Sequence, residues 1–354
     1  MNFNKILDFL ESKYPKKYAL SWDNVGLQIG STSSDVKKIL ISLNISDKEA
    51  QHAINNNVDA IISHHPLIFR SLNNINTDSP TGKLIQYLLQ NNISVYSMHT
   101  NFDVFWNGMS DILAKEYELK NIEVIKNTGY EPYCKLVVYV PEQNFEKFKT
   151  SFLDLEIGHI GNYSHCSFYC SGTGTFKPLD GTNPYIGKKG KLEITSEFKI
   201  ETIVKEKDLE DVINQMIEIH PYEEIAYDIY KLDNKKNNIG LGRIGECSPI
   251  RIQKLLEKIN GTMKGSFIAK ESTIKRIAVC AGSGGNLISD AANKEAEVYI
   301  SGDISYHDSL EAESYGLPII DIGHHESEKH GISYIANMLR KKFKNDITVI
   351  EIED

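Results

Sequence analysis

The sequence has few cysteines, and no two of them form a CxxC pair. Five cysteines among 354 residues are an odd and sparse set, whereas secreted proteins that depend on disulfides are short and carry many. This pattern argues against a disulfide framework. We therefore expect a cytoplasmic protein in a reducing environment.

The chain also lacks long apolar runs and an excess of positive charge. No apolar stretch approaches the roughly 20 residues that a membrane-spanning helix needs, so we expect no membrane segment. Lys and Arg number 39 against 48 Asp and Glu, which leaves a formal net charge of −9. Nucleic-acid binding depends on Lys and Arg that neutralise phosphates, so the charge balance argues against a nucleic-acid partner.

The overall composition is that of an ordinary globular protein, and the length of the chain favours two domains. Strand-like and helix-like segments alternate over residues 1–128, as in "KKILISLNIS", "DKEAQHAINNN" and "VDAIIS". The same alternation returns over residues 240–354. This order predicts an α/β core with a mostly parallel sheet wrapped by helices.

Residues 129–239 follow a different pattern. Two strand–helix–strand units are separated by glycine-rich hairpin signals such as "GTGTFKPLDGTNPYIG". This β-α-β, β-α-β order predicts an inserted α+β module with a ferredoxin-like sheet and one helical face. The expected fold is therefore an α/β core that this module splits in sequence.

Histidines and carboxylates follow three of the apolar strands in the predicted core. The side chains in these positions are His64, His65, His99, Asp103, His324 and Glu328. In an open parallel sheet, ligands bind at the carboxyl ends of the strands. Three distant segments would thus deliver these side chains to one edge, and we predict a metal site there.

The spacing of these residues indicates which of them would bind metal. His324 and Glu328 are four residues apart, so they share one face of a helical turn, and Glu328 could bridge two metals. Consecutive histidines project in different directions, which suits one imidazole for each of two ions. The five predicted ligands are His64, His65, Asp103, His324 and Glu328.

This ligand set predicts a catalytic rather than a structural site. Three imidazoles and two carboxylates cannot fill the coordination of two divalent ions, so water must complete it. Two dications facing two carboxylates keep about two positive charges, which lowers the pKa of a bridging water and attracts an anionic substrate. The mixed ligands suit zinc, iron or manganese, and we expect two such ions per subunit.

Structural interpretations of the same residues stay open. A histidine pair can lie on the surface or cap a turn, and "HHESE" could be a solvated helix start whose acids favour the helix dipole. His99, Asp303 and His307 could orient ligands or move protons, or they could cap turns. His325 would face away from the site or contact substrate.

Two other segments could hold a ligand. "AGSGGN" follows a strand and could cradle a phosphate with backbone N–H groups, although a plain strand-to-helix turn is the simpler interpretation. "HIGNYSHCSFYC" brings Cys166 and Cys170 close to histidines. Its alternation is typical of a hairpin, and the role of these thiols stays open.

Several stretches of the sequence resemble the NIF-three-like family, whose members are often labelled GTP cyclohydrolase 1 type 2 homologues. In the core these stretches are "WDNVGLQIG", "SHHPLIF", "HTNFD", "SGDISYHD" and "GHHESEKHG". The insert resembles the extra domain of the longer bacterial members in "GTGTFKPLDGTNPYIG" and "HPYEEIAYDIY". The resemblance covers nearly the whole chain.

The resemblance implies a dinuclear metal site, and the family's ligand motifs match the five residues selected above. It also implies a homohexameric ring with the inserted module over the ring openings. GTP cyclohydrolase chemistry opens the imidazole ring of guanine and releases formate. An activated water would attack C8, with His99 or His307 as the general acid or base.

Three functions are therefore in view. The first is a metal-dependent hydrolase that acts on a nucleotide or a related ring, GTP being the substrate that the resemblance suggests. The second is a metal-binding regulatory or scaffold ring without turnover, whose insert senses a small molecule or a partner. The third is a DNA-encircling ring, which would need a locally basic lumen despite the net charge.

Overall fold

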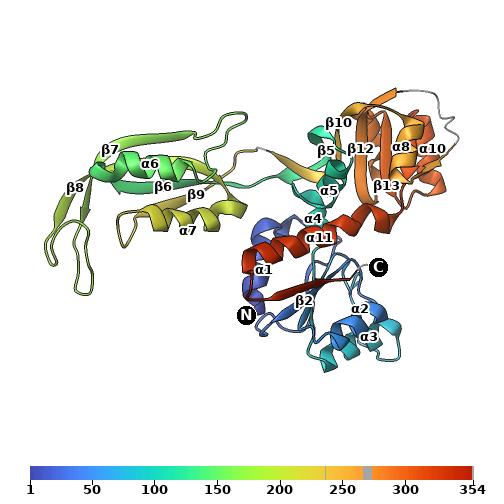
Figure 1. Ribbon diagram of the computed structural model, residues 1–354, viewed down its shortest axis with the longest axis horizontal. Coiled ribbons are helices and arrows are strands. Elements are labelled where there is room, and N and C mark those ends of the chain that lie inside the picture. The colour runs from blue at the N-terminus through green and yellow to red at the C-terminus, as the bar shows by residue number, and fades with distance from the viewer. Residues whose placement is uncertain (236, 266–272, 353–354) are drawn as a thin grey trace. The chain divides into compact units, whose positions relative to one another are not determined.

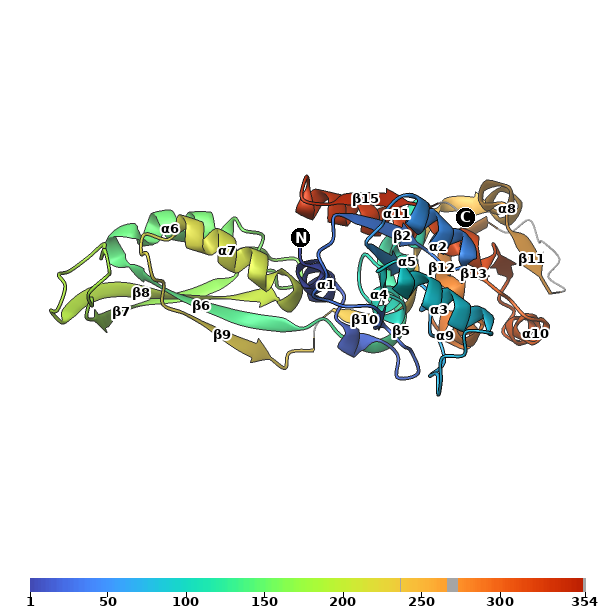
Figure 2. The same ribbon diagram turned by 90° about the horizontal axis from the view of Figure 1, so that it is seen from below.

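The computed structural model describes residues 1–235, 237–265 and 273–352. The chain forms two compact units, one made of Met1–Gly129 with Asn238–Asp354 and the other of Tyr130–Asn237. We call the first the core unit and the second the insert. Figures 1 and 2 show the helices and strands of each from two directions.

The first sheet of the core unit has five strands in the order β1-β4-β3-β2-β15. Four of them are parallel neighbours, and β1 pairs antiparallel with β4. Their bounds are Gly26–Ile29 for β1, Lys38–Ser42 for β2, Ala60–Ser63 for β3, Ser94–Ser97 for β4 and Thr348–Glu351 for β15. Every residue of β3 and β4 is buried, as expected of strands covered on both faces.

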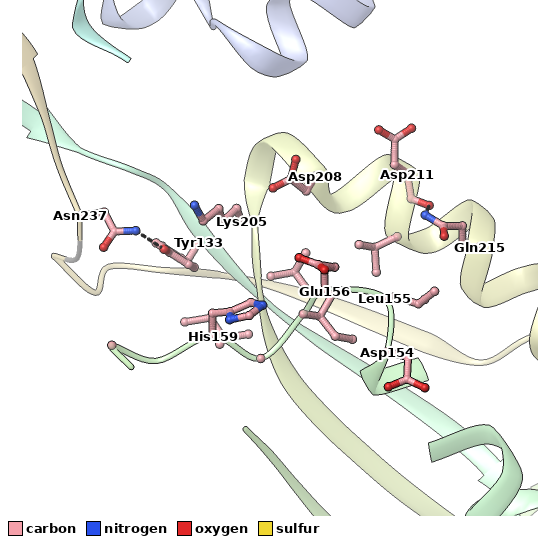
Figure 3. Close-up of a pocket in the computed structure, with 16 residues that line it drawn as sticks. Tyr133, Asp154, Leu155, Glu156, His159, Lys205, Asp208, Asp211, Gln215 and Asn237 are labelled. Carbon is pink, nitrogen blue, oxygen red and sulfur yellow. Dashed lines mark hydrogen bonds between the residues drawn. The ribbon is translucent and has the colours of Figure 1, made fainter. Parts of the chain in front are cut away.

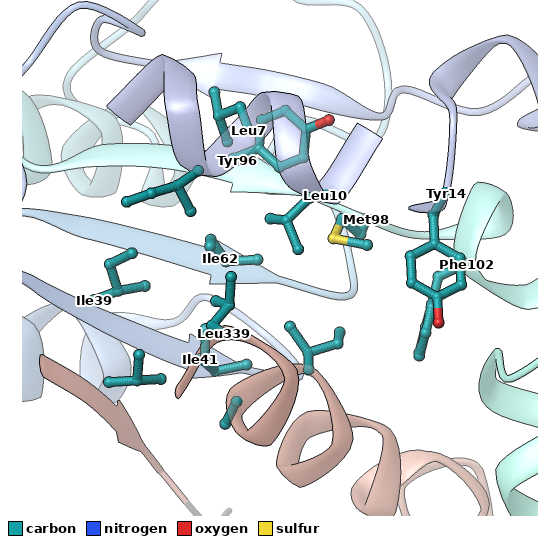
Figure 4. Close-up of a cluster of buried hydrophobic side chains, with 14 of the residues drawn as sticks. Leu7, Leu10, Tyr14, Ile39, Ile41, Ile62, Tyr96, Met98, Phe102 and Leu339 are labelled. Atoms are coloured by element: carbon teal, nitrogen blue, oxygen red, sulfur yellow. The ribbon is translucent and has the colours of Figure 1, made fainter. Parts of the chain in front are cut away.

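Helices cover both faces of this sheet. On one face lie α2 (Asp47–Asn55), which a Ser46–Glu49 capping box starts, and α3 (Pro80–Gln90). On the other lie α1 (Phe3–Lys13) and α11 (His324–Phe343). Figure 4 shows the second interface, where the sheet and these two helices bring together Leu7, Leu10, Ile39, Ile41, Ile62, Tyr96 and Leu339.

The second sheet of the core unit has six strands in the order β11-β14-β13-β12-β10-β5. β12, β13 and β14 are parallel neighbours, and β10 and β11 add antiparallel at either side of them. The bounds are Lys120–Tyr130 for β5, Asn238–Arg251 for β10, Thr262–Lys264 for β11, Thr273–Ser283 for β12, Val298–Gly302 for β13 and Ile319–Asp321 for β14.

Helices also pack on both faces of the second sheet. α5 and α8 share one apolar cluster with it, and α9 and α10 share the other. Their bounds are Met109–Glu116 for α5, Ile252–Ile259 for α8, Ile288–Asn293 for α9 and Tyr306–Ser314 for α10. The short helix α4 (Thr100–Val104) follows β4 directly.

A buried arginine links the segment after α4 to the second sheet. Arg243 on β10 donates to the carbonyl of Phe105 at 2.9 Å and forms an ion pair with Asp111 on α5. Its other donors reach the carbonyls of Gly240 at 2.7 Å and Gly242 at 2.9 Å. The charge is thus fully paired, as a buried guanidinium requires.

The core unit therefore contains two sheets, whereas the sequence pattern led us to expect a single, mostly parallel one. Alternating strands and helices specify parallel neighbours within a group of strands. They do not specify that two such groups, here residues 38–97 and 273–321, join into one sheet. The long antiparallel strand β10 instead pairs with β12 and β5 in the second group.

The insert has the element order β6-α6-β7-β8-α7-β9. Its four strands form an antiparallel sheet in the order β7-β8-β6-β9, and both helices lie on one face, as Figure 2 shows. The bounds are Tyr133–Pro141 for β6, Phe145–Leu153 for α6, Ser167–Phe176 for β7, Glu193–Lys205 for β8, Leu209–Ile219 for α7 and Tyr227–Leu232 for β9.

Candidate metal centre

The carboxyl ends of strands from both core sheets supply the predicted histidines. In the first sheet, β3 leads into His64 and His65, and β4 leads into His99 at the start of α4. In the second sheet, β14 leads through Gly323 into His324, the first residue of α11. The side chains meet between two sheet edges within the core unit, where the sequence had suggested one edge.

His64 is fully buried, and its ring is held in one orientation. Nδ1 lies 2.8 Å from the carbonyl oxygen of Met98, which can only accept, so Nδ1 donates its proton there and Nε2 is the ring nitrogen that faces the carboxylates. Nε2 lies 3.6 Å from Asp103 Oδ1 and 3.7 Å from Glu328 Oε1. Among the described residues, none of His64 Nε2, Asp103 Oδ1 and Glu328 Oε2 has a hydrogen-bond partner.

His65 and His324 follow the same arrangement. The Nδ1 atom of His65 lies 2.8 Å from Asn44 Oδ1, and that of His324 lies 2.6 Å from Asp303 Oδ2. Their Nε2 atoms are 3.2 Å apart, and each is 3.2 Å from Glu328 Oε2. Lone pairs and a carboxylate that converge this closely repel one another unless a cation or proton lies among them.

These contacts fit metal binding. A histidine that ligates a metal usually donates its other ring N–H to a carboxylate or carbonyl, which selects the tautomer and orients the ring. Buried polar atoms without partners are rare in proteins and costly. Within the described chain, two groups of side chains could hold an ion: His64, His65 and His99, and His65, His324 and Glu328.

His99 and Asp23 form a linked pair beside these groups. His99 Nδ1 lies 2.9 Å from Asp23 Oδ1, while Asp23 Oδ2 accepts from the Thr100 backbone N–H and hydroxyl. Burial opposes ionisation of Asp23, but the bonds from His99 and Thr100 lower its pKa to about 2. Asp23 is not among the residues predicted from the sequence, because it follows no apolar strand. Its only signal is its place in "WDNVG", a stretch that carries the family resemblance.

The electrostatics of the cluster favour a positive charge on His64 and on His324. Burial alone would lower the pKa of His64, but Asp103 and Glu328 raise it to about 9. Glu328 likewise raises the pKa of His324 to about 9, against the effect of burial. Burial would raise the pKa of Glu328, yet the imidazoles, His64 first, lower it well below its usual range. The site therefore retains protons that a metal ion can replace.

Other predicted residues lie farther out. Asp303 is exposed and acts on the cluster through its bond to His324. His307 is exposed on α10, where its ring lies 5.7 Å from that of Tyr306, and His325 is exposed on α11. The structure thus brings His99 to the cluster and gives His307 a surface contact.

The "AGSGGN" turn brings backbone close to Glu328. Gly282 has φ +69°, and a Cβ there would lie 2.4 Å from Glu328 Oε1 and 3.4 Å from His324 Nε2. Its N–H donates to Ser327 Oγ at 2.8 Å. Glycine at this position therefore leaves room for the carboxylate, which is a packing role within a strand-to-helix turn.

A cavity of about 260 Å³ adjoins the cluster. His65, His99 and His324 line one part of it, and Trp22 and Phe69 line another. Candidate metal ligands, apolar surface and two exposed aromatic rings thus share one small space in the core unit.

The insert contains a separate hollow of about 700 Å³, shown in Figure 3. Charged side chains of both signs line it, including Asp154, Glu156, Lys205 and Asp211, together with His159. Both groups of metal-capable side chains in the described residues belong to the core unit instead. The thiols of "HIGNYSHCSFYC" are unpaired, with Cys166 partly exposed and Cys170 exposed on β7.

Within the described residues, none of the helices combines the length and the apolar character that spanning a bilayer would need.

The chain is similar to known proteins over its whole length. The sequence profile of the family Duf34/NIF3 (NGG1p interacting factor 3) matches residues 1–354. A Bacillus subtilis (strain 168) protein named "GTP cyclohydrolase 1 type 2 homolog" is 39% identical over 366 residues, covering 100% of this chain and 97% of the relative. A protein of the same name from Halalkalibacterium halodurans is 37% identical over 359 residues, covering 99% and 96%.

A solved structure gives the same result. The Bacillus cereus protein related to NIF3 matches with a TM-score of 0.78 and 36% identity, covering 100% of this chain and 97% of that one. This chain, a mixed α/β fold with several sheets, therefore shares its fold with that protein. The profile match and these identities over whole chains show that the protein belongs to the Duf34/NIF3 family.

Proposed function

We propose that this protein is a dinuclear metal-dependent hydrolase that acts on a nucleotide or a related ring, with GTP as the first substrate to test. The observation that carries the proposal is the shared geometry of His64, His65 and His324. Each donates Nδ1–H to an oxygen and turns Nε2 toward Glu328. The names of the relatives supply GTP as the candidate substrate.

The two oxygens of Glu328 support two ions rather than one. Oε1 faces His64 at 3.7 Å, whereas Oε2 faces His65 and His324 at 3.2 Å each. Asp103 stands on the His64 side, 3.6 Å from its Nε2. A bridging Glu328 would therefore join one ion held with His64 and Asp103 to a second held with His65 and His324. Zinc, iron and manganese all suit this ligand set.

Two divalent ions bound there would supply Lewis acidity and a water of lowered pKa. The residues of the chain would supply the rest. Asp23 holds Nδ1 of His99 and leaves Nε2 as the free ring nitrogen, so His99 can take a proton from the attacking water. Hydrolysis of the guanine imidazole ring adds one water at C8 to give a formamide, and a second water then releases formate.

The test is formate release from GTP by the metal-loaded protein, beside Glu328→Ala at equal concentration. We expect turnover in the wild type and none in Glu328→Ala. Glu326→Ala is the matched control, because Glu326 lies on the same helix but is exposed and pairs with Lys329. It should keep its activity. No formate from a protein that carries its full complement of metal would refute GTP hydrolysis.

A second candidate function is a metal-binding regulatory ring without turnover. The separate hollow of about 700 Å³ in the insert supports it, since a sensing module needs a ligand site of its own. A metal shell saturated by protein ligands, measured by X-ray absorption spectroscopy, would favour this function. Open coordination positions filled by water would favour the hydrolase.

We also infer that residues 129–239 form a ferredoxin-like module inserted into a cytoplasmic, homohexameric protein. The β-α-β-β-α-β order and antiparallel sheet of the insert support the module. The Glu131 N–H donates to the Asn237 carbonyl at 2.9 Å, so both ends of the insert lie together and a short linker can replace it. Removing residues 130–237 should leave a folded core that binds metal. Light scattering of the full chain tests the hexamer.

A further inference from the structure

We propose that Trp22 and Phe69 form a stacking site for a planar nitrogen heterocycle, such as a purine, at the candidate metal centre. The two side chains are 56% and 52% exposed, although both line the cavity beside the histidine cluster. Their ring centroids are 5.8 Å apart and their planes differ by 52°. Large aromatic side chains are normally buried, so two exposed ones in a cavity indicate a surface that a ligand covers.

The backbone holds Trp22 in place even though its side chain is exposed. Its neighbour Asp23 accepts bonds from the His99 ring at 2.9 Å and from the Thr100 backbone N–H at 2.9 Å. Trp22 is therefore attached to the start of α4 through Asp23. A fixed backbone lowers the entropy that is lost when a ligand orders the side chain.

Phe69 is tied to the same segment. The amide of Asn24 donates to the carbonyl of Ile68, and the N–H of Ile68 donates to Gln28 Oε1 at 3.1 Å. Residues 22–24 and 68–69 thus form one hydrogen-bonded unit. The two aromatic rings belong to distant parts of the sequence, yet this network sets their separation.

Both rings lie against His99. Its ring centroid is 5.9 Å from Trp22 and 6.4 Å from Phe69, with interplanar angles of 74° and 66°. His65 and His324 line the same cavity. A ring that stacks on the aromatic pair therefore reaches the side chains that we propose for metal binding and for proton transfer.

The size of the cavity restricts the ligand. About 260 Å³ lies below the roughly 300–1,000 Å³ that is typical of sites for whole drug-sized ligands. The space suits a bicyclic ring, while a sugar or phosphates attached to it would remain outside. Stacking on Trp tolerates any base, because every base has a π-face. The site therefore selects planar bicyclic rings as a class and does not distinguish one base from another by stacking.

This inference rests on the proposed function for the role of the ring as substrate, but its test measures binding. The chain has two tryptophans. Trp106 is held apart from the cavity, since its indole N–H donates to the Asn238 carbonyl at 2.9 Å and its ring lies against Arg243. In Trp106→Phe, emission therefore reports on Trp22. If Trp106→Phe folds poorly, the difference in emission between the wild type and Trp22→Phe gives the same Trp22 signal.

The probes are guanosine, adenosine, pterin and inorganic triphosphate, titrated into the metal-loaded protein. We expect saturable quenching of Trp22 by the ring compounds and none by triphosphate. Trp22→Leu and Phe69→Leu should each weaken guanosine binding about tenfold, the lower part of the range for loss of one base–aromatic stack. Calorimetry measures guanosine affinity in these variants, because Trp22→Leu removes the fluorophore. Tyr315→Leu, which changes an exposed aromatic on α10's C-terminal side, should leave guanosine affinity unchanged.

Failure of this inference can be told apart from failure of the proposed function. Quenching by none of the ring compounds, or unchanged guanosine affinity in both leucine variants, overturns the stacking site. Formate release from GTP with an unchanged KM in Trp22→Leu also overturns it and leaves the hydrolase standing. Guanosine binding that Trp22→Leu weakens supports the stacking site even when no formate forms, in which case GTP hydrolysis is the proposal that falls.

Discussion

The core unit and the insert each bury carboxylates, but they treat the charge in opposite ways. In the insert, Glu131 pairs with Lys205 at 3.1 Å, Lys207 at 3.0 Å and the amide of Asn237 at 3.0 Å. Burial would raise its pKa, and Lys207 and these neighbours lower it. The positive charge that Glu131 needs comes from its own unit.

Among the residues that the structure describes, the ion pairs of the core carboxylates Asp103 and Glu328 are with histidines, not with lysine or arginine. Asp103 and Glu328 face imidazoles, which are positive only while they hold a proton. His64 is completely buried, so water does not screen the charge of its ring. A buried carboxylate paired with lysine indicates a structural ion pair, whereas one paired with histidines whose Nε2 atoms converge indicates a candidate site for an exchangeable cation.

The largest expected effect is the loss of metal when a core carboxylate is removed. Glu328→Ala and Asp103→Ala each remove a carboxylate whose negative charge would hold the proposed metal ions beside the imidazoles. Metal affinity should fall by more than the roughly 10–100-fold that loss of an outer partner costs. Elemental analysis after dialysis measures this, and circular dichroism should show the fold retained. Unchanged metal content in both variants would contradict the ligand assignment.

The next effect concerns pH. The pKa values of His64 and His324 are raised to about 9, so before metal binds both are protonated at pH 7. Metal must displace these protons, and its apparent affinity should rise about tenfold per pH unit for each displaced proton up to about pH 9. Calorimetry in buffers of different ionisation enthalpy measures the proton release. An affinity that stays constant from pH 7 to 9 would contradict it.

The stability of the metal-free protein should change with pH in the opposite sense. A histidine whose pKa is raised on folding stabilises the folded state fully below its ordinary pKa of about 6.5, and this contribution is lost as pH rises through about 9. Thermal unfolding of the metal-free protein at pH 6 and pH 9 therefore provides an independent check on the same two groups.

A smaller effect is expected from the glycine beside Glu328. In Gly282→Ala the new Cβ would lie 2.4 Å from Glu328 Oε1, so the carboxylate must shift and metal affinity should fall by about tenfold. Gly316→Ala is the matched control, because Gly316 has φ +63° with open space around the added Cβ. Both variants carry the cost of a left-handed backbone, and only Gly282→Ala should weaken metal binding in a titration.

The smallest effect on metal should come from the paired carboxylate of the insert. Glu131→Ala leaves Lys205 and Lys207 without their shared partner and should destabilise the insert by about 1.5–3 kcal/mol, the range for hydrogen bonds to charged groups. Denaturant unfolding measures this change, and the metal content should equal that of the wild type. Loss of metal in Glu131→Ala would contradict the assignment of a structural role to Glu131 and of metal binding to the core carboxylates.

Much of the candidate site could be predicted from local sequence. Apolar runs predict β3, β4 and β14 because buried strands need such residues, and the polar residues that end each run then mark strand ends. His64 and His65 follow the β3 run directly, and His324 follows the β14 run after Gly323. The i, i+4 spacing of His324 and Glu328 is itself a helical property, and α11 begins at His324.

The parts that spacing could not predict depend on contacts between distant residues. Asp23 reaches His99 across 76 positions, and Asn44 orients His65 across 21. Neither residue lies in a pattern of period 2 or 3.6, so no periodicity identifies it. The same holds for Trp22 and Phe69, which become a pair only when the chain folds.

The amino-acid sequence alone indicates the local elements and the chemical type of the candidate site, because strand and helix periods and the kinds of side chain at strand ends are local properties. The tertiary structure alone decided that the strands form two sheets, that both sheets supply the cluster, and which side chain orients each imidazole. These depend on pairing and packing through space, where residues far apart in the chain compete for the same partners. Two features follow from the tertiary structure alone: the pairing of the buried core carboxylates with histidines, and the Trp22–Phe69 pair beside them.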